Sequence, residues 1–281
     1  MKSILVPMEE HVLIQSVLKT GLMLGRALDG YMEGMAITPN MPSSYASDIT
    51  IGAIGDISFL DPEVRRRRSE ASRRLFETFM AAQGVPRPDT GPTGLCFGWR
   101  LGELKEDDFV GHYGRAFDIT VLGRPSDQAN HPRPPTVEAA LFESGRPVLI
   151  APPTPPETFG ATVVIAWNRS TETARTVALA MPLLAKAHRI IVIDLEDWGV
   201  SGPSTRELRH TLNRNGLPVE IRTVPNPNGH AGEAILSAAR SMGCDLLVKG
   251  AYTQSRLRQF IFGGATSHIL SNTTVPVLMA H

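Results

Sequence analysis

One segment near the carboxyl end of the chain has residue types and spacing that suit the binding of an anion. Gly250 ends an apolar strand, and Gly263-Gly264 opens a helical pattern that contains Thr266. Glycines let backbone N–H groups approach a phosphate, and a helix N-terminus adds positive potential. The same pattern also fits a plain strand–loop–helix connection, in which glycine serves only the turns. The segment therefore predicts either a phosphate-binding loop or an ordinary connection.

Motifs for other common chemistries are missing from the sequence. The 8 histidines form no His-x3-His or His-Glu-x2-His pair, so we expect no metal site. Gly-x-Ser-x-Gly and Gly-x4-Gly-Lys-Ser/Thr are absent, so neither a nucleophile elbow nor a phosphate-gripping lysine is indicated. Cys96 and Cys244 cannot build a disulfide framework, which favours a reduced, cytoplasmic compartment.

The composition indicates a globular protein with about two domains. The chain has 281 residues, of which 42% are hydrophobic and 20% charged. Lys plus Arg is 28 and Asp plus Glu is 28, so no global basic field exists to hold nucleic acid or an anionic membrane. No apolar run approaches the ~20 residues that span a bilayer. We therefore expect no nucleic-acid partner and no membrane association.

A run of four arginines, Arg65–Arg68, stands out against this balance. It lies in a helical pattern over 63–79 with interspersed glutamates, so a solvated helix face with i,i+4 ion pairs explains it. A patch for RNA or an acidic partner is the alternative. The apolar side of this helix is expected from Leu75, Phe76 and Phe79.

The strand and helix that carry the glycine segment belong to a repeat of the chain. Two apolar strands lie 159 residues apart, at Ile4 and Val163, and each is followed by a helical stripe at an offset of 160. Matches near the end of each copy have offsets of 127 and 129, and four matches in one order indicate duplication. The matching segments are 4–8 and 163–167, 14–25 and 174–185, 118–123 and 245–250, and 146–151 and 275–280.

Within the second copy, strands alternate with helices, which predicts an open, doubly wound parallel sheet. Ligands of such sheets lie beyond the carboxyl ends of the strands, where the strand order reverses. Pro182 should kink or locally break the first helix. The predicted strands are 162–167, 189–195, 218–224, 245–250 and 275–280, and the predicted helices are 171–187, 203–215, 230–242 and 264–272.

The offset between matching segments falls from 160 to 127 along the chain. This difference places about 33 extra residues in the middle of the first copy. Residues 38–60, with several prolines and glycines, fit this insertion and read as a long, mobile or extended loop. Pro152–Pro156 is a stiff linker. The predicted domains are therefore 1–152 and 160–281.

These segments resemble the universal stress protein family in its tandem two-domain form. The strand-four motif of that family is Gly-x2-Gly-x9-Gly-Ser/Thr, and this chain has Gly250-x2-Thr253-x9-Gly263-Gly264. The first-strand loop, 164–170, is similar to the family's apolar run followed by Asp, Gly and Ser, and the terminal Val-Pro-Val-Leu strand agrees as well.

The resemblance implies an α/β fold with two Rossmann-like (adenine nucleotide alpha hydrolase-like) domains. Each would hold a five-stranded, mainly parallel sheet. In the family the last strands pair across a dimer, so 146–151 and 275–280 should pair here in an intramolecular pseudo-dimer. A homodimer of the whole chain stays open.

The resemblance also implies an adenine-nucleotide site, for ATP or AMP, in the second domain. In ATP-binding members the first-strand loop and the second strand hold adenine and ribose, and the glycine loop holds the phosphates. Here Thr253 replaces a glycine, and Asn168 replaces an acidic residue but keeps an acceptor. The implied residues are Ala166, Trp167, Asn168, Leu195, Gly250, Thr253, Gly263, Gly264, Ala265 and Thr266.

The first copy lacks most of this pattern. Its equivalent positions are Gly123, Ser126, Thr136 and Val137, so one glycine of three remains, and prolines stiffen the loop. We interpret the first copy as a structural partner without a phosphate loop.

Three functions remain open on the sequence. The first is a non-enzymatic stress-response module that binds an adenine nucleotide in its second domain. The second is a protein–protein interaction module that has lost nucleotide binding. The third is a slow ATPase, although no general base is convincingly placed, and function depends on sites rather than on folds.

Overall fold

The computed structural model describes residues 1–37, 61–88, 94–100, 107–126, 128, 130–226, 228–251 and 264–281. The expected insertion at 38–60 lies outside these described residues. In chain order the elements are β1 (Ser3–Met8), α1 (Ile14–Leu28), β2 (Tyr31–Ala36), α2 (Pro62–Ala82), β3 (Cys96–Trp99), α3 (Asp107–Gly114), β4 (Ile119–Gly123), α4 (Pro134–Glu143), β5 (Val148–Ala151), β6 (Thr162–Ala166), α5 (Thr171–Leu184), β7 (Arg189–Leu195), α6 (Thr205–Arg214), β8 (Val219–Val224), α7 (Ala231–Ser241), β9 (Leu246–Gly250), α8 (Gly264–Asn272) and β10 (Val277–Ala280).

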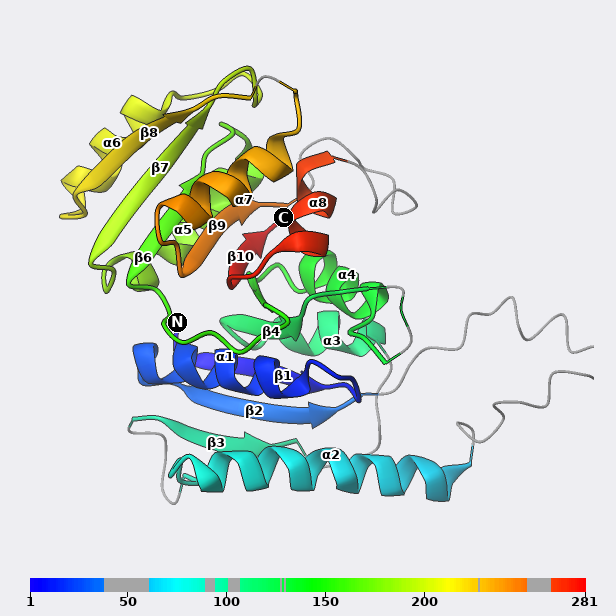
Figure 1. Cartoon of the computed structure of the whole chain (residues 1–281). Helices are drawn as coiled ribbons and strands as arrows, with labels where there is room; N and C mark the ends of the chain where they lie inside the picture. Colours follow the sequence, from blue (N-terminus) through cyan, green and yellow to red (C-terminus); the bar gives the residue numbers. More distant parts are fainter. Residues whose placement is uncertain are drawn as a thin grey trace, which may run out of the picture.

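The strands form one ten-stranded sheet in the order β3-β2-β1-β4-β5-β10-β9-β6-β7-β8 (Figure 1). Every neighbouring pair is parallel except β5 and β10, which are antiparallel. The α/β prediction with a mainly parallel sheet is confirmed. The two expected five-stranded sheets are joined into one.

The two halves of the sheet repeat one strand order. Strands β1–β5 and β6–β10 each run third, second, first, fourth, fifth, so the two fifth strands meet at the centre. There Leu149 lies opposite Leu278, and Ile150 lies opposite Val277. The pairing expected between 146–151 and 275–280 is therefore present. It covers two apolar strands that would otherwise be exposed edges.

Side chains point alternately to opposite faces along each strand, so the hydrophobic core is divided between the two faces of the sheet. Val163 and Ile165 pack with residues of α1, α2, α5 and α6, whereas Val164 and Ala166 pack with residues of α3, α4, α7 and α8. Because each strand is covered on both faces, its residues are apolar almost without interruption, as in other parallel sheets. Burial of this apolar surface is the main stabilising contribution to the fold.

The predicted elements of the second half agree with the structure to within three residues at each end. Pro182 is an exception to the sequence interpretation, because α5 continues through it to Leu184. The expected break is absent. Pro182 lies in the last turn, and the N–H of Ala185 still bonds to Met181 O at 2.9 Å, so the helix loses little before it ends.

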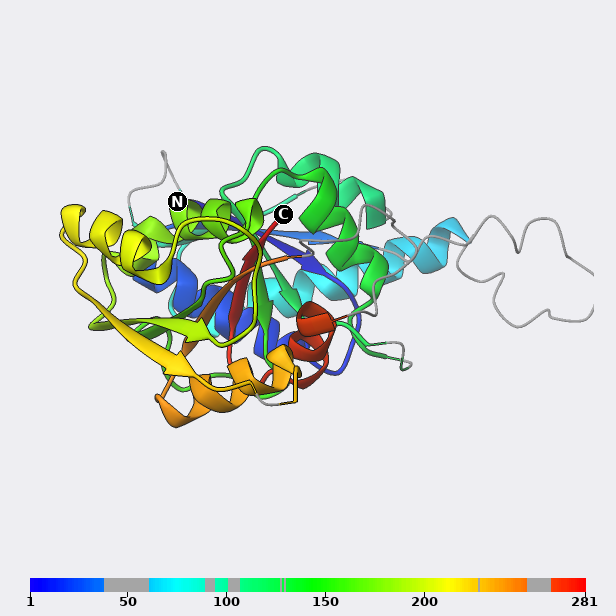
Figure 2. The ribbon, with the colours of Figure 1, turned by 90° about the horizontal axis from the view of Figure 1, so that it is seen from above.

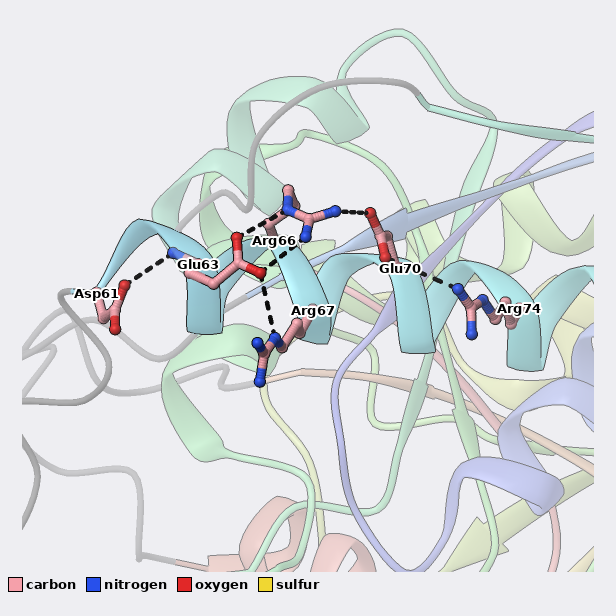
Figure 3. A network of polar contacts seen from close by, with 6 residues as sticks. All are labelled: Asp61, Glu63, Arg66, Arg67, Glu70 and Arg74. Atoms are coloured by element: carbon pink, nitrogen blue, oxygen red, sulfur yellow. Dashed lines mark hydrogen bonds and ion pairs between the residues drawn. The ribbon is translucent and has the colours of Figure 1, made fainter.

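The arginine run forms part of α2, whose amino-terminal part projects beyond the sheet (Figures 1 and 2). Arg66 bridges two carboxylates, with ion pairs of 2.8 Å to Glu63 and 2.6 Å to Glu70 (Figure 3). The predicted solvated face with ion pairs is confirmed. Phe76 is fully buried, but Leu75 is 37% exposed, so its assignment to the apolar side is wrong. None of the described helices is both long and apolar enough to cross a membrane.

Candidate functional site

The strand order of the second half reverses between β6 and β9. The chain leaves β6 for β7 on one side and later reaches β9 on the other side, so the carboxyl ends of β6 and β9 flank a switch point. Ala166 pairs with Lys249 in this register. The structure therefore brings the predicted first-strand loop next to Gly250, at the place where ligands of open α/β sheets bind.

Asn168 organises the loop between β6 and α5. Its Oδ1 accepts hydrogen bonds from the Ser170 N–H at 3.2 Å and from the Thr173 hydroxyl at 2.5 Å. Ser170 is the N-cap of α5 and accepts the Thr173 N–H at 3.2 Å. The predicted ligand contact is thus also a positioning residue, because it fixes the first turn of α5.

The predicted adenine-side residues are buried, and they divide between the two faces of the sheet. Ala166 is 0% exposed and Leu195 is 2% exposed, and both belong to the core under α7 and α8. Trp167 is 4% exposed, packs on the opposite face, and donates its indole N–H to Pro203 O at 2.8 Å. These three side chains do not form one shared surface.

The two described glycines of the predicted phosphate segment are needed at their positions for different structural reasons. A Cβ at Gly250 would lie 2.4 Å from Thr173 N, so a glycine is required for the close approach of β9 to α5. Gly264 opens α8 with a φ of +76°, a conformation that strains other residues, and nothing lies within 4 Å of its Cβ position. Thr253 and Gly263 lie outside the described residues.

Ala265 and Thr266 follow Gly264 in the first turn of α8. Ala265 is half-buried and packs against the core under α7 and α8. Thr266 is 6% exposed, and its hydroxyl faces the end of β9. The first turn of α8 therefore meets the carboxyl end of β9, as the predicted site requires.

Lys249, the residue before Gly250, is not among the residues that the sequence predicts. Alternation along β9 turns its side chain toward α8, where Nζ donates to Gly250 O and to the Thr266 hydroxyl, both at 2.7 Å. The side chain is 3% exposed. Burial lowers the pKa of Lys249 to about 7, and the Glu172 carboxylate opposes part of that shift.

Glu172, in the first turn of α5, is the nearby carboxylate. Although burial disfavours its charged form, hydrogen bonds from its own N–H and from the Thr171 and Ser170 hydroxyls lower its pKa. Its Oε2 is buried and has no hydrogen-bond partner among the described residues. The switch point thus holds a buried cation and an incompletely satisfied carboxylate.

A sequence signal for Lys249 does exist. It is the one charged residue in the apolar run Leu246–Lys249, and the repeat places Leu122 at the equivalent position. A cation in a buried strand position is rare unless it has partners. Among the described residues no cluster of three or more His, Cys, Asp or Glu side chains could hold a metal ion.

The second half of the chain is similar in sequence to known proteins. Residues 162–281 match the model of the universal stress protein family. A universal stress protein from Synechocystis is 36% identical over 67 residues, which are 24% of this chain and 22% of that protein. The match thus spans about a fifth of the length of that relative.

Solved structures match the whole chain in fold. A universal stress protein from Archaeoglobus fulgidus superposes with a TM-score of 0.68 at 14% identity, over 99% of this chain and 95% of that chain. A Pseudomonas aeruginosa protein described as a universal stress protein gives 0.54 at 14% identity, over 99% and 92%. At this identity the likeness shows the fold. The segment that matches the universal stress protein family model begins with β6 and ends after β10, so the match covers the whole second half of the sheet.

Proposed function

We propose that this chain is a tandem universal stress protein, a non-enzymatic cytoplasmic stress-response module that binds an adenine nucleotide, ATP or AMP, in its second half. The tandem form is supported by the repeated strand order and by the whole-chain likeness to solved structures. The paired fifth strands support an intramolecular pseudo-dimer. The nucleotide proposal depends on the switch point between β6 and β9.

The contact between Lys249 and Thr266 is the observation that carries nucleotide binding. It sets a cation and a hydroxyl at the first turn of α8, whose N-terminus favours negative charge. An anion beside Lys249 would favour the charged ammonium and raise its pKa above about 7. These residues fit the phosphate end of a nucleotide better than its base.

The residues expected to contact adenine are less well arranged for binding than those expected to contact the phosphates. Asn168 Oδ1 already accepts two hydrogen bonds, and Ala166 and Leu195 are buried in the core. A bound adenine therefore requires some rearrangement of the 166–170 loop, which reduces affinity. We propose weak binding, dominated by the phosphate groups.

An interaction module without a nucleotide is the second candidate. The observation in its favour is that Gly250 contacts the first turn of α5, so this glycine has a packing role that needs no phosphate. The buried Trp167 also favours the interaction module, because its indole N–H already donates a hydrogen bond within the protein. A protein partner would then be the physiological ligand.

ATP titration by calorimetry separates these candidates, together with mass spectrometry of nucleotide that co-purifies with the protein. We expect Lys249→Leu to weaken ATP binding by about 10–150-fold, since hydrogen bonds to charged groups contribute roughly 1.5–3 kcal/mol. Adenosine, which has no phosphate, should bind both proteins equally. The control is Arg206→Gln, an exposed α6 substitution outside the switch point.

Absence of ATP binding in the wild type would overturn the nucleotide proposal and favour the interaction module. Equal loss of ATP and adenosine in Lys249→Leu would show that the lysine supports the fold rather than the phosphates. Release of inorganic phosphate from ATP, measured under the same conditions, tests the non-enzymatic assignment. We expect none above the uncatalysed rate.

A further inference from the structure

A cleft of about 390 Å³ lies between the two halves, at the end of the sheet opposite the switch point. Its walls come from the end of α1, the turns that follow α5, and residues 159–161, which lead into β6. The volume lies within the range of small-molecule sites, about 300–1,000 Å³. None of its lining residues belongs to the proposed nucleotide site.

The charged lining of this cleft is entirely basic. Arg26, Lys186 and His188 line it, and no carboxylate does. The Arg26 guanidinium is held by Gln83, with Nη2 at 3.3 Å from the backbone O and 3.4 Å from Oε1. Within the part of the chain that the structure describes, the Lys186 and His188 side chains have no hydrogen bond or ion pair. Both side chains are exposed, so both are accessible to a ligand at this opening.

Basic residues near a helix C-terminus often serve only to complement the helix dipole. That explanation fits Arg26, which lies in the last turn of α1. It also fits Lys186, which directly follows the C-cap of α5, but it does not explain why the charges of two different helices line one cleft. The terminal carbonyls of α5 already accept backbone N–H groups, from Lys186 to Leu183 at 3.0 Å and from Ala187 to Leu184 at 3.1 Å.

The repeat explains why cations meet here. Arg26 and Lys186 are 160 residues apart, the same offset as the helical stripes of α1 and α5. Helices α1 and α5 contact each other across the junction of the halves. Equivalent positions of the two copies thus face one cleft, and each contributes a positive charge.

The rest of the cleft is preorganised and partly apolar. The N–H groups of His188 and Arg189 both donate to Ala161 O at 3.0 Å, which fixes the wall beside β6. Leu183 is 2% exposed, and Phe159 packs against the same core while lining the cleft. An apolar surface under a basic rim is the arrangement that small organic anions require.

We propose that this cleft binds a small organic anion whose phosphate or carboxylate contacts Arg26, Lys186 and His188. The apolar portion of that ligand, an aromatic ring or short chain, lies against the half-buried Phe159. The site is independent of nucleotide binding at the switch point, because the two lie at opposite ends of the sheet.

The test is a titration of the full chain with phenyl phosphate, benzoate and inorganic phosphate, followed by NMR of the Ala161 and His188 backbone amides. We expect saturable shifts with phenyl phosphate or benzoate, and the better of the two identifies the anionic group. Combining Arg26→Gln with Lys186→Gln should weaken that binding about fivefold, since exposed charge pairs contribute about 0.2–1 kcal/mol each. Arg206→Gln, outside the cleft, should leave it unchanged.

Phenyl phosphate can also occupy the switch point, so Lys249→Leu is included and should bind at the cleft with unchanged affinity. Lack of amide shifts with either aromatic anion would overturn the proposal. Unchanged affinity in the double variant would overturn it as well. Equal affinity for inorganic phosphate and phenyl phosphate would overturn the role of the apolar wall.

Discussion

The two halves of the molecule begin their sheets in the same way. Asp118, before β4, accepts the Ser3 N–H at 2.9 Å and hydroxyl at 3.0 Å at the start of β1. Asp245, before β9, accepts the Thr162 N–H at 2.9 Å at the start of β6. The same carboxylate thus joins the first and fourth strands in both halves. The two halves share this anchor, although other equivalent positions differ.

The opposite ends of the same strands are different. In the first half, Pro132 lies over Gly123, where an added Cβ would be 2.4 Å from its Cγ. The Arg133 N–H donates to Glu9 at 3.3 Å, and the Val12 N–H donates to Asn130 O at 2.8 Å. The loop after β4 is therefore closed onto the loop after β1.

His11 adds to this closure. Its Nδ1 accepts the Leu13 N–H at 3.1 Å, and burial lowers its pKa to about 4, so the ring is neutral at physiological pH. The second half has Asn168 and Ser170 in the corresponding loop and Lys249 at the position of Leu122. The first half therefore fills its switch point with its own side chains, whereas the second half places a buried lysine there.

The largest expected effect contrasts the two strand-end glycines. Gly250→Ala would bring a Cβ against the backbone of Thr173, which cannot move without shifting α5. We expect a loss of about 3 kcal/mol in the free energy of unfolding. Gly123→Ala meets one side-chain ring, that of Pro132, rather than the backbone of a helix, so we expect a smaller loss of about 1 kcal/mol. Urea unfolding followed by circular dichroism gives both values, and equal losses would contradict this account.

The shared anchor should be equally important in both halves. Asp245→Ala leaves two backbone N–H groups, of Ala161 and Thr162, without their acceptor, which should cost about 2 kcal/mol. Asp118→Ala should cost a similar amount. Because hydrogen bonds from Lys2 and Ser3 oppose the effect of burial and lower the pKa of Asp118, its contribution is lost as pH falls through that pKa.

Unfolding of both variants at neutral pH, compared with Glu196→Ala as an exposed control, measures the anchors. A loss confined to one half would show that the repeat is not equivalent at this end. The pH dependence of stability in Asp118→Ala should be weaker than in the wild type at acidic pH.

Much of the fold was accessible from sequence because it depends on local patterns. The apolar runs and helical stripes predicted the element order, and the repeat together with the family resemblance predicted the pairing of 146–151 with 275–280. A break at Pro182 is not observed, because the effect of a proline depends on how close it lies to the helix end. The exposure of Leu75 depends on how far α2 extends past the sheet, which no local pattern contains.

The candidate site was harder to predict from the sequence than the fold, since it depends on the directions of side chains. The pattern of glycines correctly placed Gly250 at the end of β9 and Gly264 at the start of α8. The contact between Gly250 and Thr173 is visible only in the three-dimensional structure. Likewise, the position of Lys249 in a strand gives its face, but not its partner Thr266. Thr253, at the centre of the predicted loop, lies outside the described residues, so its role stays a prediction.

Replacement of Thr253 tests how far the second half has diverged from a full nucleotide loop. A glycine there would permit positive φ, whereas a β-branched residue in that conformation costs roughly 1–2 kcal/mol. We therefore expect Thr253→Gly to tighten ATP binding by about 5–30-fold. Ser126→Gly, at the equivalent position of the first half, is the matched control and should have no effect.

Calorimetric titration with ATP measures both variants. Tight wild-type binding that Thr253→Gly leaves unchanged would contradict this explanation of the loop. Binding created by Ser126→Gly would contradict the view that the first half is closed by Pro132 and its neighbours.

The effect that is spread over the widest range of conditions is the pH dependence contributed by Lys249. Its pKa is about 7 in the folded chain and about 10.4 in an unfolded one, so the unfolded state binds more protons between these values. Stability from this group therefore rises with pH across that window, by at most about 1.4 kcal/mol per pH unit. Lys249→Leu, which copies Leu122 of the first half, removes the effect. Because both proteins keep the same thiols and tyrosines, those contributions cancel in the difference.

Below pH 7 the ammonium is charged in both states, and its burial is unfavourable, so Lys249→Leu should be the more stable protein there. The advantage should shrink as pH rises toward 10, where the neutral amine keeps its hydrogen bond to Thr266 without the cost of a buried charge. Urea unfolding of both proteins across this range gives the difference directly. A difference that does not change with pH would mean that Lys249 is hydrated or paired in the folded protein, and the second half would then lack the buried charge that distinguishes it from the first.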